Sequence, residues 1–204
     1  NMIKEYFMDY YVYQSDITVD LQNNKIEIHK NRTEDWKVTV VDTGLYSATG
    51  HRVAQIQNYI KEDNFILTYG DCLSDIDVSQ MYAYHMQQGK LATMAVAQPT
   101  GRNKSLEISP EGLVVKRQHA MEENQAWTNA CLFVLNKKIF HILNGNYEME
   151  SFLLNNLAEE KQLITYKHEG FWTPVETYRD RVNMENLWNA GVAPWIKTLQ
   201  TPVS

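Results

Sequence analysis

Residues 64 to 99 read NFILTYGDCLSDIDVSQMYAYHMQQGKLATMAVAQP, and this stretch decides the fold. "NFILTYG" and "LATMAVAQP" are short apolar runs, each ended by a turn residue, which is typical of strands. Between them, Asp77 suits the N-cap of a helix and Gly89 its C-terminal end. A strand, a helix and a second strand in this order indicate a βαβ unit, whose two strands lie parallel.

The segments on either side continue this alternation. Residues 49–62 carry Val53, Ile56 and Ile60 at helical spacing, and the β-branched run 36–44 is expected to be a buried strand. The other expected elements are a helix at 3–11, two strands within 16–29, a hairpin at 105–118, a strand at 129–136, a helix at 148–162, a strand at 163–168 and an amphipathic helix at 175–191. We therefore expect one α/β domain over residues 1–204, with a mixed, mostly parallel sheet flanked by helices.

Composition and charge limit the classes of function. The chain has 204 residues and 44% hydrophobic content, which is enough for one substantial core. The net charge is -6 and there is no basic block, which argues against a nucleic-acid partner. No apolar stretch approaches the roughly 20 residues that cross a bilayer, and the N-terminus has no secretion-signal pattern, so we expect a cytoplasmic protein without a membrane partner.

Asp71 is the first candidate site residue. In open α/β sheets, ligands bind outside the carboxyl ends of the strands, and Asp71 directly follows one such end. The position suits a metal ligand, but an aspartate after a strand is also a common turn residue, and the pattern by itself favours the turn. His168 is expected to be a hydrogen-bonding residue at a strand end, and Cys131, on an apolar strand, a small core residue. Neither Cys131 nor Cys72, the other cysteine, belongs to a CxxC pattern, so the sequence supports no zinc or disulfide framework.

Several short motifs carry a family resemblance. They are "IKEYF", "VDTG", "TG" at 49, "LTYGD", "SDIDV", "GKLAT", "QPTGR", "TYKHEGFW", "TYRD" and "LWNAGVAPW". In this order and spacing, the chain from residue 3 to residue 197 resembles bacterial glucose-1-phosphate cytidylyltransferases, members of the sugar-phosphate nucleotidyltransferase family. The resemblance implies a Rossmann-like nucleotidyltransferase fold, and a reaction in which a sugar 1-phosphate attacks the α-phosphate of CTP, giving a CDP-sugar and pyrophosphate.

The resemblance also assigns residues. It implies that Asp71 and Glu176 hold Mg2+, whose preferred ligands are oxygens. The substrate-binding positions that it implies are Arg102, Asn129, Glu150 and Lys167. It assigns no catalytic side chain. The expected partners are CTP and a sugar 1-phosphate, with a homo-oligomer as a further possibility because the family commonly forms one.

Other positions depart from the family pattern. The 204 residues contain no GGxGTRL loop, the usual cradle for the triphosphate, so we expect the first βα unit of the fold to be absent. Glycines in the family motifs "GRFGAL", "GDG" and "NGG" become Lys104, Cys72 and the pair Ala130–Cys131. We therefore expect that this chain keeps the scaffold and is inactive or only weakly active. The alternative is a non-catalytic scaffold or binding partner of an active nucleotidyltransferase.

Overall fold

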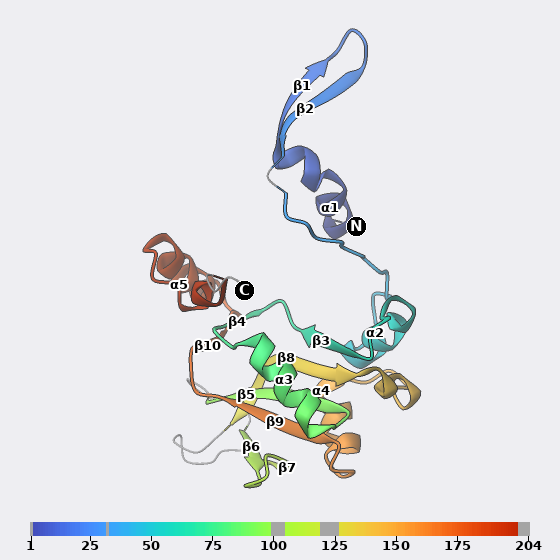
Figure 1. Ribbon diagram of the computed structural model, residues 1–204, viewed down its shortest axis with the longest axis vertical. Coiled ribbons are helices and arrows are strands. Elements are labelled where there is room, and N and C mark those ends of the chain that lie inside the picture. Colours follow the sequence, from blue (N-terminus) through green and yellow to red (C-terminus); the bar gives the residue numbers. More distant parts are fainter. Residues whose placement is uncertain (1, 32, 99–104, 119–126, 200–204) are drawn as a thin grey trace. The chain divides into compact units, whose positions relative to one another are not determined.

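The structure, a computed structural model, describes residues 2–31, 33–98, 105–118 and 127–199 (Figure 1). It divides into two compact units, Asn1–Gly44 and Leu45–Ser204. The expectation of a single domain over residues 1–204 stays a prediction.

The first unit contains a helix and a hairpin. Its elements are α1 (Met2–Tyr13), β1 (Ser15–Asp20) and β2 (Lys25–Asn31), and the two strands pair antiparallel. Asp20 accepts hydrogen bonds from the backbone N–H groups of Gln22 and Asn23, both at 3.0 Å. Asn24 has a φ of 53°, a left-handed conformation that asparagine tolerates. The predicted aromatic helix and the turn at the asparagine pair are confirmed.

The expected buried strand at residues 36–44 is wrong. None of these residues lies in a strand, and Trp36 and Val38 are 66% and 45% exposed. β-branched side chains favour a strand only where a neighbouring strand supplies hydrogen bonds and packing. Within the described part of the chain no strand pairs with this segment, so its apolar pattern alone does not make it one.

The second unit contains the remaining helices and strands. The helical segments are α2 (Thr49–Gln55), η1 (Gln57–Tyr59), α3 (Val78–Gln88), η2 (Lys137–His141), α4 (Met149–Phe152), η3 (Leu153–Leu157), α5 (Tyr178–Asn189) and η4 (Pro194–Leu199). The strands are β3 (Asn64–Thr68), β4 (Cys72–Ser74), β5 (Ala92–Ala97), β6 (Ser105–Ile108), β7 (Val114–Gln118), β8 (Thr128–Asn136), β9 (Leu163–His168) and β10 (Trp172–Pro174). Among the described residues, no helix has the length and apolar character needed to span a membrane.

Four strands form the central sheet in the order β3, β8, β5, β9. β8 pairs antiparallel with both β3 and β5, while β5 and β9 are parallel. The α/β class with a mixed sheet flanked by helices is thus confirmed. β3, β5 and β9 run in one direction and β8 opposes them, so the described sheet is mixed and mostly parallel, as predicted. β3 and β5 both pair antiparallel with β8, so they run parallel to each other, as the βαβ interpretation of β3, α3 and β5 requires; β8 lies between them in the sheet.

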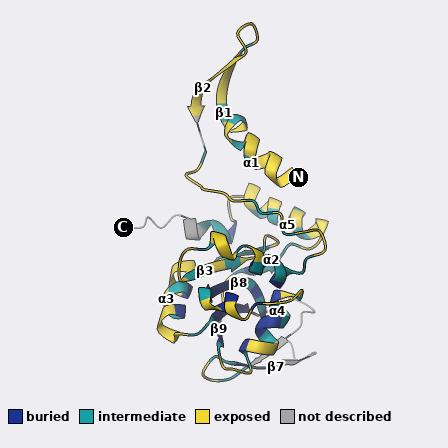
Figure 2. Cartoon of the chain, turned by 90° about the vertical axis from the view of Figure 1, so that its right-hand side faces the viewer, coloured by how far each residue is buried: buried dark blue, intermediate teal, exposed yellow. Residues whose placement is uncertain are grey.

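The sheet separates two apolar clusters, because successive side chains of a strand point to opposite faces. On β5, Met94 and Val96 join one cluster, which includes residues of α2, α4 and η3. Ala95 and Ala97 join the other, which includes Met81 of α3. Every residue of β5 is buried. Figure 2 shows the buried residues gathered in the central sheet and the helices beside it, while most of α1, β1 and β2 is exposed.

The helix ends follow the sequence in part. The Asp77 side chain caps α3 by accepting from the Gln80 N–H at 2.9 Å, and Gly89 ends that helix in a left-handed conformation, both as predicted. α2 is shorter than expected and is followed by η1. The apolar stripe expected on α5 through Tyr178, Val182 and Leu187 is present in part: Val182 and Leu187 are half-buried, whereas Tyr178 is 79% exposed and no residue of the helix is fully buried.

Candidate functional site

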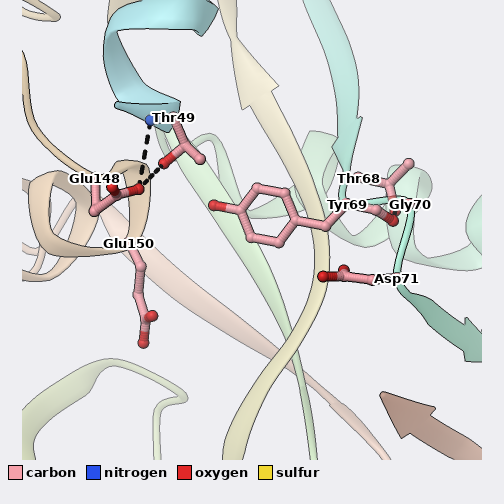
Figure 3. Close-up of a pocket in the computed structure, with 7 residues that line it drawn as sticks. All are labelled: Thr49, Thr68, Tyr69, Gly70, Asp71, Glu148 and Glu150. Atoms are coloured by element: carbon pink, nitrogen blue, oxygen red, sulfur yellow. Dashed lines mark hydrogen bonds between the residues drawn. The ribbon is translucent and has the colours of Figure 1, made fainter. Parts of the chain in front are cut away.

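A pocket of about 630 Å³ lies where β3 ends (Figure 3). Seven residues line it: Thr49, Thr68, Tyr69, Gly70, Asp71, Glu148 and Glu150. They come from the start of α2, from the segment that links β3 to β4, and from the start of α4. The pocket therefore combines the strand end expected to bind a ligand with two helix starts.

The α2 and α4 starts are joined by specific contacts. The Thr49 hydroxyl donates to Glu148 Oε2 at 2.6 Å and accepts from the Met149 N–H at 2.8 Å. The Gly50 N–H donates to the backbone oxygen of Tyr147 at 3.0 Å, and a Cβ at position 50 would lie only 2.7 Å from that oxygen. The absence of a side chain at Gly50 is thus what lets the two segments approach each other.

Replacing Gly50 by alanine should lower the free energy of unfolding by about 1 to 3 kcal/mol, the usual cost of forcing an extra methyl into a packed site. Urea unfolding followed by circular dichroism measures this change. Gly70 supplies a matched control, since a Cβ there would meet nothing within 4 Å. Equal effects of the two substitutions would contradict the close-approach argument.

The pocket is acidic. Of its seven described lining residues, Asp71, Glu148 and Glu150 are carboxylates and none is Lys or Arg. Burial raises the pKa of Tyr69, and the Glu150 and Glu148 carboxylates act in the same direction while the Thr49 hydroxyl opposes them. Figure 3 shows the Tyr69 ring directed toward Thr49 and Glu148. Such a lining suits a cation or the hydroxyl groups of a sugar, and a bare polyanion would be repelled.

A small sheet brings the two predicted metal ligands close along the backbone. β4 and β10 pair antiparallel, with Cys72 opposite Pro174, and the Val175 N–H donates to the Asp71 backbone oxygen at 2.7 Å. Asp71 therefore lies directly before β4, and Glu176 lies two residues after the end of β10. Because the two strands are antiparallel, both positions are at the same end of this small sheet. Both side chains are exposed, so their carboxylates are accessible to an ion from solvent.

The other predicted residues lie in different places. Glu150 shares the pocket with Asp71. Asn129 lies on β8, where its Oδ1 accepts from the Cys131 N–H at 2.9 Å, and Lys167 lies on β9 with its Nζ 5.4 Å from the centroid of the Trp127 ring. Neither lines the pocket. Arg102 lies outside the described residues. The roles assigned to all these residues stay predictions.

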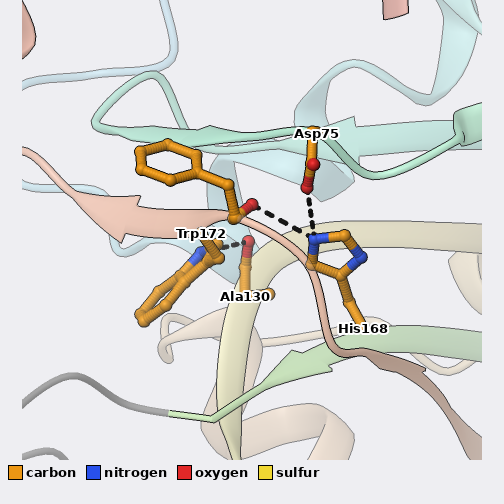
Figure 4. A network of polar contacts seen from close by, with 5 residues as sticks. Asp75, Ala130, His168 and Trp172 are labelled. Carbon is orange, nitrogen blue, oxygen red and sulfur yellow. Dashed lines mark hydrogen bonds and ion pairs between the residues drawn. The ribbon is translucent and has the colours of Figure 1, made fainter. Parts of the chain in front are cut away.

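The segment between β9 and β10 is held against β8 (Figure 4). His168 Nε2 lies 2.8 Å from Asp75 Oδ1 and 3.1 Å from the backbone oxygen of Phe171. Trp172 is buried and donates from Nε1 to the Ala130 oxygen at 3.1 Å. The prediction that His168 is a hydrogen-bonding residue is confirmed. These contacts fix the path of the chain that leads to Glu176.

Beside the pocket, the sulfur atoms of Cys72 and Cys131 lie close together. Hydrogen bonding with the Cys131 thiol, burial and the charge of Asp71 raise the pKa of the Cys72 thiol. Cys131 is a non-glycine residue with a φ of 62°. It lies at a bulge, where the register between β5 and β8 shifts between Met94 and Val96. The family resemblance places glycines at the two cysteine positions, so this chain has side chains where the family pattern has none.

Sequence reasoning missed five of the seven described residues that line the pocket. Thr49 belonged to a motif of the resemblance, which gave it no role. The sequence pattern placed Thr68, Tyr69 and Gly70 at the end of a strand and Glu148 at the start of a helix. Their convergence depends on the contact between α2 and α4, which joins positions about 100 apart in the chain. The one local signal was the glycine at position 50, which marks a close backbone approach.

Comparisons with known proteins extend these observations. No protein-family model matches the sequence. The chain is 38% identical over 198 residues to a glucose-1-phosphate cytidylyltransferase of Salmonella typhi, an alignment that covers 95% of this chain and 76% of that protein. A probable glucose-1-phosphate cytidylyltransferase of Bacillus subtilis is 32% identical over 195 residues, with the same two coverages.

Solved structures support the fold. A putative glucose-1-phosphate thymidylyltransferase from Bacillus anthracis, in complex with sucrose, aligns with a TM-score of 0.58 at 15% identity and covers 72% of this chain. A UDP-glucose pyrophosphorylase complexed with UDP-glucose gives the same score and identity and covers 74% of this chain. The chain spans 62% and 65% of those two structures. With 38% identity over 95% of its length to the Salmonella protein, the chain belongs to the glucose-1-phosphate cytidylyltransferase family.

Proposed function

We propose that this chain is a cytidylyltransferase-type protein that binds CTP and glucose 1-phosphate with the help of Mg2+, and that these 204 residues by themselves form CDP-glucose slowly or not at all. The observation that carries the proposal is the acidic pocket at the end of β3. There Asp71 and Glu150 share one lining, and Glu176 follows the strand paired beside Asp71.

The described residues fit the metal that the family resemblance implies. Asp71 and Glu176 would hold Mg2+, because both offer exposed carboxylate oxygens and the pairing of β4 with β10 fixes their backbones beside each other. When bound, the ion would offset the charge of the phosphates. Without such an ion, the three carboxylates of the pocket would repel a triphosphate.

The proposed reaction is a direct displacement. A phosphate oxygen of glucose 1-phosphate attacks the α-phosphorus of CTP, and the bond from that phosphorus to the bridging oxygen of the β-phosphate breaks. Pyrophosphate leaves with the bonding electrons, and no bond to the protein forms. The chain therefore contributes positioning and electrostatics. We assign Glu150 to sugar hydroxyls, because a carboxylate on the pocket wall can accept their hydrogen bonds.

Features of the described chain explain why we expect slow turnover. No Lys or Arg is among the seven described residues that line the pocket. Lys167 lies over the Trp127 ring, in a cation–π arrangement outside that lining. The cysteines at positions 72 and 131 occupy space where the family resemblance places glycine. We expect each feature to lower the affinity for a nucleotide while the sheet stays intact.

Calorimetry and a turnover assay test the proposal. The protein should release heat with CTP when Mg2+ is present and not when EDTA replaces it. Pyrophosphate release should be slow or undetectable; where it is detected, it should require both CTP and glucose 1-phosphate, and GTP or UTP should replace CTP poorly. Glu150→Gln should raise the KM for glucose 1-phosphate and leave CTP binding unchanged.

The scaffold alternative gives a different result. A non-catalytic partner of an active nucleotidyltransferase would show no nucleotide heat with or without Mg2+. Such an outcome would overturn the proposal, provided that circular dichroism shows the expected mixture of helix and strand. The exposed aromatic side chains that favour this alternative include Trp36 and Tyr178.

A further inference from the structure

We propose that Cys72, Cys131 and Asp71 form a binding site for zinc or a similar thiophilic divalent metal. The Sγ atoms of the two cysteines and a carboxylate oxygen of Asp71 all lie within 4.8 Å of one another. Cys72 Sγ lies 3.8 Å from Asp71 Oδ1. The inference goes beyond the cytidylyltransferase function and does not depend on it.

The distances match what a zinc ion needs. In a tetrahedral site with Zn–S bonds of about 2.3 Å, two sulfur ligands lie about 3.8 Å apart, and a carboxylate oxygen lies slightly closer to each sulfur. A set of donors already within 4.8 Å can meet this geometry through small side-chain rotations. The protein supplies three ligands, and water can supply the fourth, because Asp71 is exposed.

The ligand types select the metal. Thiolates are soft ligands that favour Zn2+ and similar ions, whereas Mg2+ prefers oxygen. Binding would replace the thiol protons, which pass to solvent as the two sulfurs bond to the ion. Asp71 would belong to both this site and the proposed Mg2+ site, so the two ions would compete for it.

The backbone conformation of Cys131 helps to place its sulfur. Its φ of 62° is left-handed, which is unfavourable for a residue with a Cβ and easy for glycine. Asn129 supports this bend by accepting from the Cys131 N–H at 2.9 Å. The Cys131 backbone also pairs with Tyr69, whose N–H donates to its oxygen at 3.1 Å. The strained backbone thus holds the Cys131 sulfur beside the other two donors.

Cobalt spectroscopy tests the site. The reduced protein, freed of reductant under anaerobic conditions, should bind one equivalent of Co2+ and show sulfur-to-cobalt charge-transfer absorption, which Zn2+ abolishes by displacement. Cys131→Gly should weaken Co2+ binding by at least about 100-fold, since even indirect supports of a metal site are worth 10 to 100-fold. Glycine adopts a positive φ without steric cost, so this variant should fold. Cys72→Ser should have the same effect on binding.

Controls separate this site from other metal binding. His141→Asn, which removes an exposed imidazole, should leave the charge-transfer band unchanged. Stoichiometric Zn2+ should also slow alkylation of both thiols in the wild-type protein. Three results would overturn the proposal. The fully reduced protein shows no charge-transfer band with Co2+, the Cys131→Gly variant keeps the band at full strength, or both thiols are alkylated as fast with Zn2+ as without it. Because no nucleotide is involved, a failed turnover assay would not affect this result.

Discussion

Replacing Trp172 by alanine should lower the free energy of unfolding by about 3 to 5 kcal/mol, the range for removing a large buried aromatic side chain. Trp172 is 7% exposed and packs in the cluster that contains Met81 and Leu132. Its Nε1 donates to the Ala130 oxygen at 3.1 Å, so the substitution also removes a buried hydrogen bond. Urea unfolding followed by far-UV circular dichroism measures the loss.

Trp188 is the matched control. It lies on α5 and is 58% exposed, so its replacement by alanine should change stability by about 0.5 kcal/mol or less. Similar losses in the two variants would show that the sheet of β4 and β10 is not held by Trp172. Because Trp172 begins β10 and β10 leads directly to Glu176, the Trp172 variant should also lose Mg2+ affinity.

Local patterns in the sequence predicted the elements of the second unit well. The N-cap at Asp77, the glycine that ends α3 and the continuously buried β5 all depend on neighbouring residues, so their signals lie within short segments. The hairpin of β6 and β7 is similar: Gly112 has a φ of 84°, as its place in the turn requires.

Pairing between distant segments was harder to predict. An apolar run does not state which strand lies beside it or in which direction. Residues 36–44 look like a buried strand and have no strand partner in the described chain. The position of β8 between β3 and β5, antiparallel to both, also has no signal in its own sequence. The short pairing of β4 with β10 was not predicted at all, because three-residue strands carry too weak a pattern.

The same limit applies to the site. Asp71 and Glu176 were found through the family resemblance, but the hydrogen bond that joins their segments links residues about 100 apart. The proximity of Cys72 and Cys131 follows from the bulge in β8 and from the turn after β3, neither of which is visible in the spacing of two isolated cysteines. Residue types predicted candidates, whereas long-range contacts decided which of them meet.

Replacing Asp71 by asparagine should weaken Mg2+-dependent CTP binding by at least about 100-fold, because a lost metal ligand should exceed the 10 to 100-fold effect of groups that only support one. Asparagine keeps the shape of the side chain and removes its charge. Asp71 is exposed and its backbone oxygen, not its side chain, holds Val175, so the fold should be unaffected. Calorimetry with CTP at several Mg2+ concentrations measures the effect.

Two further variants make this prediction specific. Glu176→Gln should reduce binding in the same way, and the double variant should be little worse than either single one, because both residues would hold the same ion. Asp63→Asn is the control: Asp63 is also exposed, but it precedes β3 at the opposite end of the strand from Asp71. A loss of binding as large in this control would mean that general negative charge attracts Mg2+. Unchanged binding in the Asp71 variant would place the ion elsewhere, since a carboxylate that coordinates a cation cannot lose its charge without effect.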